Sequence, residues 1–320
     1  MTAIASTFTY LTKRQGGLLT VIGLIFVLVI AGLVLSDRFG TASNAANILE
    51  QSTALALVSL GQTLVILTGG IDLSIGSLIS LASVLLSGIT DGSTSMMWVA
   101  LAVVLGLGIM VGLLNALATI YLGVHPLIVT LGMGAILQGV TLLYTQTPVG
   151  KMPKGFDTLA YGRVLGIPVG ALFVIVVFLL CAWFLRKVPF GRYIYAVGDD
   201  PVGAQLMGLP RKKVLLFVYA FCGLMASVAA IFLVARLGVG QPYTGQNFTL
   251  TSITPVVVVG GTLLSGGRGG VIGTLMGVYL VSLLNNLLNF LDVSSHYQLI
   301  VQGLIVIIAV SVYVENKKRV

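Results

Sequence analysis

The sequence predicts an all-α integral membrane protein with about ten transmembrane helices, both termini in the cytoplasm, and one short, broken span. Of its 320 residues, 57% are hydrophobic and only 8% are charged, whereas soluble domains carry about 25% charged residues. The mean hydropathy is +1.08. Apolar runs long enough to cross a bilayer recur along the chain. No polar linker divides them, so residues 1–320 are predicted to form a single transmembrane domain.

Ten apolar runs are candidate spans, because a bilayer core needs about 20 mainly apolar residues in a helix. The first run is longer than the roughly 7–15 apolar residues of a secretory signal. It is therefore predicted to stay as a helix, with cleavage near the sequence ASNAA as the alternative. The spans are expected at residues 18–35, 52–68, 73–89, 97–120, 126–144, 168–185, 214–235, 250–264, 271–290 and 296–313.

The eighth span, 250–264, is short and contains Pro255 and the pair Gly260 and Gly261. Proline removes a backbone donor, and irregular backbone is not tolerated where it faces lipid. The segment is therefore expected to be buried among other helices or to line a polar cavity. A kinked helix with no special role is the alternative.

The basic residues support this span count and its orientation. With both termini inside, five of the 17 Lys and Arg residues fall in outside segments and the others fall inside, as the positive-inside rule expects. This topological role explains the net charge of +8 better than nucleic-acid binding does. The outside residues are Arg38, Lys151, Lys154, Arg163 and Arg236.

The sequence lacks the motifs of common enzyme classes. Its two histidines, His125 and His296, lie far apart, and no GxxxxGK[ST] phosphate loop is present. Cys181 and Cys222 lie in apolar runs and are interpreted as small hydrophobic residues. If the protein moves a solute uphill, the energy must come from another chain or from an ion gradient.

Amide side chains are the candidate lining of a transport pathway. Ion-coupled carriers usually bury charged groups in mid-span, but these spans are nearly free of charge, so neutral and hydroxyl-rich cargo is favoured. The alternative for each single amide is an interhelical hydrogen bond, worth about 0.6–2 kcal/mol. The candidates are Gln62, Asn115, Gln138, Asn285, Asn286, Asn289, Gln298 and Gln302.

The stretch TGGIDLSIGS, residues 68–77, interrupts two apolar runs. Gly69 and Gly70 permit a tight break, and Asp72 or Ser74 can cap the helix that follows. Two interpretations stay open, a structural cap and a gate near the cytoplasmic face.

Glycines also predict close helix packing. In the sequence GGVIGTLMGVYL, Gly269, Gly273 and Gly277 recur every four residues, which lets another helix approach closely. Gly108 and Gly112 repeat this spacing in the fourth span.

The inside loop 186–213 contains the signals of a short helix at 201–207. The N-cap residue, the proline at the first helical position and the glycine after the end are all of favoured types. A helix this short is unstable alone in water. Its apolar stripe of two residues is therefore expected to dock on the membrane domain or on a partner. A helix lying on the membrane surface is the alternative. The segment comprises Asp199, Asp200, Pro201, Val202, Gly203, Ala204, Gln205, Leu206, Met207 and Gly208, with Asp200 as N-cap and Val202 and Leu206 as the stripe.

Four stretches carry a family resemblance. They are LGQTLVILTGGIDLSIGSLISLAS (60–83), LIVTLGMGAILQGVTLL (127–143), FGRYIYAVGDDPVGAQLMGLP (190–210) and the segment 256–310, which begins VVVVGGTLLSGGRGG. They resemble the membrane permeases of bacterial ribose-type sugar ABC importers across nearly the whole chain. Branched-chain amino acid permeases share the fold and match these stretches less well.

The resemblance implies a permease domain that works in the inner membrane as a pair with a second copy or a paralogous permease. It implies an ATPase partner, either two subunits or one double subunit, which would hold ATP and Mg, so no cofactor is expected on this chain. A periplasmic binding protein would deliver the sugar, and the 201–207 helix would be the coupling helix seated in the ATPase. No nucleic-acid partner is expected.

Some positions depart from the family pattern, and these put the exact sugar in doubt. Glu50 stands where the family often has a basic residue, and Thr249 and Thr251 stand in a stretch that commonly has an acidic pair. A facilitator or secondary carrier acting alone, a permease for another solute such as a branched-chain amino acid, and a signalling membrane protein are the alternative functions.

Overall fold

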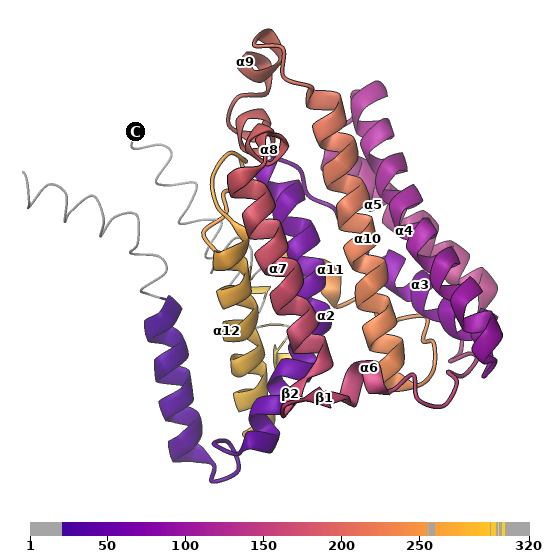
Figure 1. Cartoon of the computed structure of the whole chain (residues 1–320), viewed down its shortest axis with the longest axis vertical. Coiled ribbons are helices and arrows are strands. Elements are labelled where there is room, and N and C mark those ends of the chain that lie inside the picture. Colours follow the sequence, from indigo (N-terminus) through magenta and orange to yellow (C-terminus); the bar gives the residue numbers. More distant parts are fainter. Residues whose placement is uncertain are drawn as a thin grey trace, which may run out of the picture.

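The computed structural model describes residues 21–253, 255, 260–294, 296–298, 300 and 303–304, and this part of the chain is mainly helical (Figure 1). Two shorter apolar helices are Val21–Leu35 and α3 (Ile75–Thr90). The helices long and apolar enough to cross a membrane are α2 (Ala42–Leu67), α4 (Thr94–Tyr121), α5 (Pro126–Tyr144), α7 (Val169–Lys187), α10 (Arg211–Leu237) and α12 (Val271–Phe290). These lengths and compositions fit a multi-pass membrane protein.

Short elements complete the described fold. The helices are α6 (Thr158–Tyr161), α8 (Pro189–Asp199), α9 (Pro201–Leu206) and α11 (Phe248–Thr251). Strands β1 (Arg163–Val164) and β2 (Ile167–Pro168) pair antiparallel. The turn between them has positive φ at both residues, +53° at Leu165 and +82° at Gly166, as a two-residue hairpin of the primed type requires.

Most of the short elements lie at the two ends of the bundle, whereas α11 lies within it (Figure 1). α8 and α9 lie at one end with the start of α10, whereas α6 and the β hairpin lie at the other (Figure 1). The loop 261–270 joins the α8 end, where the Gly267 N–H donates to the Leu67 carbonyl at 3.0 Å. At the hairpin end Arg163 pairs with Glu50 at 3.3 Å. The segments that the sequence places inside therefore lie together at one end of the bundle, and the segments that it places outside lie at the other end. This arrangement is what helices that cross the membrane in alternating directions require.

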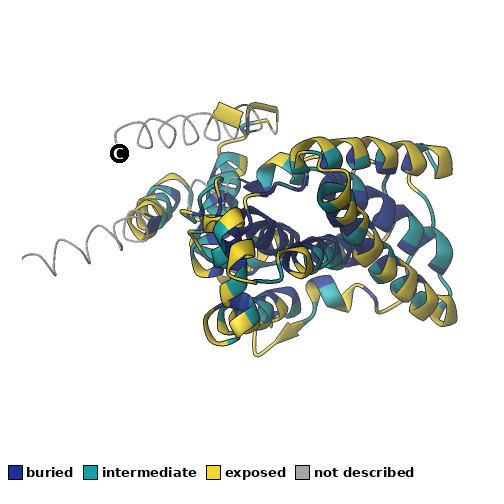
Figure 2. Cartoon of the chain, turned by 90° about the horizontal axis from the view of Figure 1, so that it is seen from above, coloured by how far each residue is buried: buried dark blue, intermediate teal, exposed yellow. Residues whose placement is uncertain are grey.

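Helix α2 runs through the centre of the bundle. Every residue from Ser52 to Leu67 is buried, and α2 is packed against α10, α12 and α7. Viewed from above, buried residues lie between the helices and exposed residues on the outer faces (Figure 2). Large apolar side chains such as Leu143 and Leu179 are among the exposed ones. This apolar exterior suits contact with lipid.

Both glycine stripes permit close backbone contacts. On α4, a Cβ at Gly108 would overlap the Gly223 carbonyl of α10. On α12, a Cβ at Gly273 would overlap the Gly260 carbonyl. The predicted close packing is confirmed for both stripes. The α12 stripe, however, contacts the broken segment around residue 260 and not a regular helix.

Two predicted spans need correction. Helix α2 begins at Ala42 and not at residue 52, and the Thr41 Oγ1 caps it by accepting from the Asn44 N–H at 3.2 Å. Its polar first turns hide this start from a hydropathy argument. The span 250–264 is not one helix: α11 ends at Thr251, and residues 261–264 are non-helical. The left-handed Gly261, with φ +64°, is incompatible with a continuing helix. The predicted span 296–313 lies largely outside the described residues.

Candidate functional sites

A polar cavity lies between α2, α11 and α12, toward the hairpin end of the bundle. Its volume is about 300 Å³. The described residues that line it carry no charge, and seven of the ten have amide or hydroxyl side chains. They are Ile48, Gln51, Leu55, Asn247, Phe248, Thr251, Ser282, Asn285, Asn286 and Gln298. Such a lining offers both donors and acceptors without fixing a charge.

Hydrogen bonds hold the amides of this cavity in place. The Asn286 Nδ2 donates to Asn44 Oδ1 at 3.0 Å, and the Asn44 Nδ2 donates back to Asn286 Oδ1 at 3.1 Å. The Gln298 Nε2 donates to Asn289 Oδ1 at 2.8 Å and to the Val293 carbonyl at 3.0 Å. The cavity therefore has a positioned polar wall on its α12 side.

The structure separates the predicted pathway amides into two groups. Asn285, Asn286 and Gln298 line the cavity, and Asn289 supports it through Gln298. The others do not line it: Gln62 and Asn115 are fully buried, and the Gln138 Nε2 donates to the Pro242 carbonyl at 3.2 Å. A role in interhelical packing fits these three residues better than a role in the transport pathway. Gln302 lies outside the described residues.

Sequence reasoning missed four cavity residues: Gln51, Asn247, Thr251 and Ser282. Gln51 was assigned to the connection before α2. Thr251 lies in the segment 250–264, which was expected to be buried among other helices or to line a polar cavity, whereas Asn247 precedes that segment. Ser282 is one helical turn from Asn285 and Asn286, and this i,i+3 or i,i+4 spacing could have indicated it.

The break between α2 and α3 is built around Asp72. The Ser74 N–H donates to Asp72 Oδ1 at 2.9 Å, and the Ser74 hydroxyl donates to the same oxygen at 2.6 Å. The Asn115 Nδ2 of α4 donates to Ser74 Oγ at 2.9 Å. Of the two proposed caps, Asp72 accepts a backbone N–H at the start of α3, whereas Ser74 makes no side-chain cap bond. Asp72 thus orders the residue that precedes α3, and its role as a cap or as a gate stays a prediction.

The two glycines of the break act differently. Gly69 has φ +80°, a left-handed conformation that glycine adopts without steric cost. A Cβ at Gly70 would overlap the hydroxyl of Tyr219 on α10. The first glycine therefore permits the turn, and the second permits close packing.

Helix α9 has the predicted caps. The Asp200 Oδ1 accepts from the N–H groups of Val202 and Gly203 at 3.1 and 3.0 Å. Gly208 has φ +76°. The helix ends at Leu206, one residue before the predicted boundary, which is within ordinary variation of helix ends.

The faces of α9 differ in exposure. Ala204 is buried, whereas Val202, Leu206 and Met207 are 70%, 84% and 83% exposed. The apolar stripe therefore points away from the membrane domain, so docking of this stripe on the membrane domain is wrong for the described structure. An exposed apolar face at the tip of the bundle is suited to a partner surface.

Helix α8 connects α9 to the bundle. The half-buried Tyr195 hydroxyl donates to the Gly269 carbonyl at 3.3 Å. Burial raises the pKa of this phenol, so it stays protonated and keeps donating at neutral pH. A Cβ at Gly198 would overlap the Leu67 carbonyl at the end of α2. Helix α8 therefore packs directly against the break after α2.

A metal centre finds no support in this part of the chain. Among the described residues, no group of three or more His, Cys, Asp and Glu side chains is close enough together to hold a metal ion.

A spanning bundle with an uncharged polar cavity and an exposed capped helix at one end is the architecture of a membrane permease. A family model for the permease component of branched-chain amino acid transport systems matches residues 44–310, and the chain belongs to this family of permeases. Like these permeases it is a transport subunit and not an enzyme.

Three relatives show how much of the chain is shared. The chain is 40% identical over 303 residues to the ribose import permease protein of Escherichia coli, covering 92% of this chain and 93% of that protein. It is 39% identical to the ribose import permease protein of Bacillus subtilis, covering 89% of each chain. It is 34% identical to the fructose import permease protein of Rhizobium meliloti, covering 90% of this chain and 82% of that one. No solved structure matches the chain.

Proposed function

We propose that this chain forms the translocation pathway of an ABC importer for a sugar or sugar-like solute in the bacterial cytoplasmic membrane. Sugar-import permeases related to it along nearly their whole length support the cargo class. The observation that carries the coupling role is α9, a capped helix that presents exposed apolar side chains at one end of the bundle.

The cavity between α2, α11 and α12 is the proposed contact with cargo. Sugars present several hydroxyl groups, each of which can donate and accept. Amides such as Gln51 and Asn247 match this pattern, and the lining holds no charge that would demand a counter-ion.

The apolar stripe of α9 is the proposed contact with the ATPase. A six-residue helix has little stability of its own in water, and α8 holds it at the tip of the bundle. Val202, Leu206 and Met207 would insert into a cleft of the ATPase. In this assembly ATP and Mg bind the ATPase, and the end with α8 and α9 faces the cytoplasm.

The rest of the assembly follows from this proposal. A second permease, identical or paralogous, completes the membrane part, and either two ATPase subunits or one double subunit complete the cytoplasmic part. A periplasmic binding protein delivers the sugar to the hairpin end. Glu50 lies at that end in its pair with Arg163, so this departure from the family pattern would affect the docking of the binding protein.

Reconstitution tests the proposed function. Proteoliposomes that hold the purified permease, its ATPase and its sugar-loaded binding protein are expected to accumulate labelled sugar only when ATP is present on the ATPase side. Vesicles with the permease alone are the control. Rapid uptake by the permease alone would overturn the importer proposal in favour of a facilitator.

A further inference from the structure

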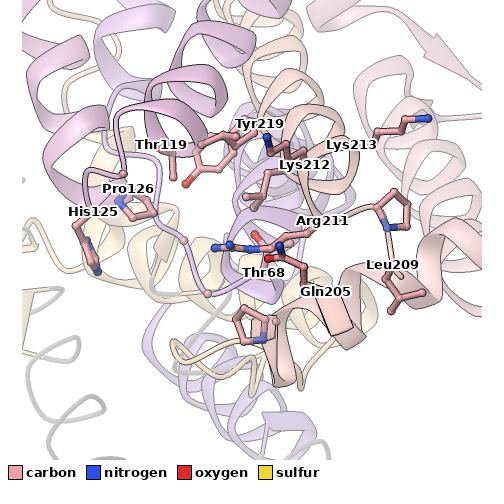
Figure 3. Close-up of a pocket in the computed structure, with 18 of the residues that line it drawn as sticks. Thr68, Thr119, His125, Pro126, Gln205, Leu209, Arg211, Lys212, Lys213 and Tyr219 are labelled. Carbon is pink, nitrogen blue, oxygen red and sulfur yellow. The ribbon is translucent and has the colours of Figure 1, made fainter. Parts of the chain in front are cut away.

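A second, larger cavity lies at the proposed cytoplasmic end, between α9 and the membrane bundle (Figure 3). Its volume is about 790 Å³. Its walls come from the α2–α3 break, the ends of α4 and α5, helix α9 and the first turns of α10. The α9 residues that line it are Pro201 and Gln205, which lie about 100° around the helix from the exposed Val202 and Leu206.

Positive charge dominates this cavity. Arg211, Lys212 and Lys213 open α10 and line it in sequence. Among the described lining residues, Asp199 is the only acidic side chain. The single salt bridge among the described residues is elsewhere, between Arg163 and Glu50, so these cations have no carboxylate partner in the described part of the chain. The Lys212 Nζ lies 4.9 Å from the centroid of the Tyr121 ring, and the Lys213 side chain points away from Arg211 (Figure 3). The first turn of α10 has no side-chain cap, so its amide dipoles add to the positive potential.

Tyr219 supplies an independent indication of a ligand. Its side chain is completely buried, yet its hydroxyl has no hydrogen-bond partner within the described structure. It lies seven residues after Lys212 and hence on the same face of α10, and both residues line the cavity (Figure 3). An unpaired buried hydroxyl is unfavourable, and a bound acceptor at this position would satisfy it.

We propose that this cavity binds a small phosphate-bearing anion, with Arg211 and Lys212 neutralising its charge and the Tyr219 hydroxyl donating to one of its oxygens. Two cations and helix amides suit a multiply charged oxyanion. The volume leaves room for a group attached to the phosphate, either the sugar of a soluble phosphorylated compound or the headgroup of an anionic lipid.

The ligand would also contact the inner face of α9. Pro201 and Gln205 face the cavity while Leu206 faces outward. A ligand in the cavity would therefore contact α9 on the side that faces the bundle and restrain its position. If α9 has its proposed role in coupling, the anion regulates transport, but the binding site itself does not depend on that role.

Calorimetric titration of the purified permease in an uncharged detergent tests the site without the ATPase. The probes are inorganic phosphate and glucose 6-phosphate, and glucose is the uncharged control. Both phosphate compounds are expected to bind and glucose to leave no signal. Absence of binding by both phosphate compounds would overturn the proposal.

Two variants and a matched control locate the binding. Tyr219→Phe removes one hydroxyl and is expected to weaken glucose 6-phosphate binding about tenfold, the order of one lost hydrogen bond to a charged group. Lys212→Gln is expected to weaken it at least as much. Lys187→Gln removes an exposed cation of the same end that does not line the cavity, so affinity should not change. Equal weakening by Lys187→Gln, or unchanged affinity in Tyr219→Phe, would contradict the site.

Two further measurements identify the source of the phosphate and the contact with α9. In nanodiscs, phosphatidylglycerol should reduce glucose 6-phosphate affinity relative to phosphatidylcholine if a lipid headgroup is the natural occupant. Equal affinity in both lipids would assign the site to a soluble compound. Hydrogen exchange of residues 199–209 should slow when glucose 6-phosphate is bound. Unchanged exchange there would refute the contact with α9.

Discussion

At the scale of single residues, Asp72 shows how a carboxylate is accommodated in a bundle with few charges. It is almost completely buried, and a buried polar group is tolerated when hydrogen bonds satisfy it. The Ser74 N–H and hydroxyl both donate to it, and Asn115 supports Ser74 from α4. Asp72 and Ser74 therefore tie the start of α3 to α4.

Substitution of Asp72 separates the cap from a gate. In Asp72→Asn the side-chain oxygen still accepts from Ser74, so the thermal unfolding of detergent-purified protein and the rate of uptake should change little. Asp72→Ala loses the cap and should cost about 0.5–2 kcal/mol of stability. A folded Asp72→Asn protein that binds its ATPase but does not transport would instead identify a gate.

The cavity amides make a second prediction at this scale. Gln51→Leu should raise the KM for uptake of the sugar severalfold without lowering the amount of folded protein, because Gln51 is exposed on the cavity wall. Gln246→Leu is the matched control: Gln246 is an exposed amide adjacent to Asn247 that does not line the cavity. Uptake kinetics that change equally in both variants would argue against a pathway at this cavity.

Sequence reasoning located the cavity only in part. The amides of α12 were found because they lie in a strongly apolar run, where any amide stands out. Gln51 and Asn247 lie in polar surroundings at helix starts and loops, where an amide is unremarkable. Gln62 is in the centre of a span yet is completely buried, because position along a helix does not reveal which face meets a cavity.

At the scale of elements, α9 combines start and stop signals with an exposed apolar face. Leu206→Asp puts a charge on this face and should weaken co-purification of the ATPase by at least about tenfold, since a charge buried at an apolar interface is unfavourable. Leu165→Asp is the control, because Leu165 is 98% exposed at the opposite end. ATPase association that survives both Leu206→Asp and Val202→Asp would exclude α9 as the coupling element.

The glycine stripe of α12 gives a prediction about packing. Gly273→Leu would force a side chain into the backbone at Gly260 and should destabilise the protein by about 1–3 kcal/mol, as overpacking does. Gly132→Leu on α5 is the control, because a Cβ at Gly132 meets no atom within 4 Å. The yield of monodisperse protein in size-exclusion chromatography measures both. Equal yields would show that α12 can move away from the broken segment.

Element boundaries were predictable wherever hydropathy alone sets them. The predicted spans 126–144 and 271–290 coincide with α5 and α12, which begin and end at sharp changes in polarity. The start of α2 was missed because its first turns carry Asn44 and Asn47, so only the Thr41 cap marks it. The break after α11 was indicated by Pro255 and Gly261, since neither residue supports a regular helix.

At the scale of the whole molecule, the charge pattern and the packing lead to the same two-ended arrangement. The positive-inside rule uses only the positions of Lys and Arg, whereas contacts such as Gly267 with Leu67 and Arg163 with Glu50 depend on the three-dimensional fold. Both place α8, α9 and the loop 261–270 at one end and the hairpin at the other. The assignment of the first end to the cytoplasm rests on the rule alone and is open to a direct test.

Cysteine labelling in intact cells tests this assignment. Lys151 and Lys187 are both exposed. Lys187 ends α7 next to α8, and Lys151 lies in the connection from α5 to α6, the helix at the opposite end of the bundle from α8 (Figure 1). Lys151→Cys should react with a membrane-impermeant maleimide from outside, and Lys187→Cys should react only after the membrane is permeabilised. The native Cys181 and Cys222 are buried, so the parent protein should give little background. The reverse labelling pattern would show that the protein has the opposite orientation in the membrane. α9 would then face away from any cytoplasmic ATPase, and the proposed coupling mechanism would fail together with the orientation.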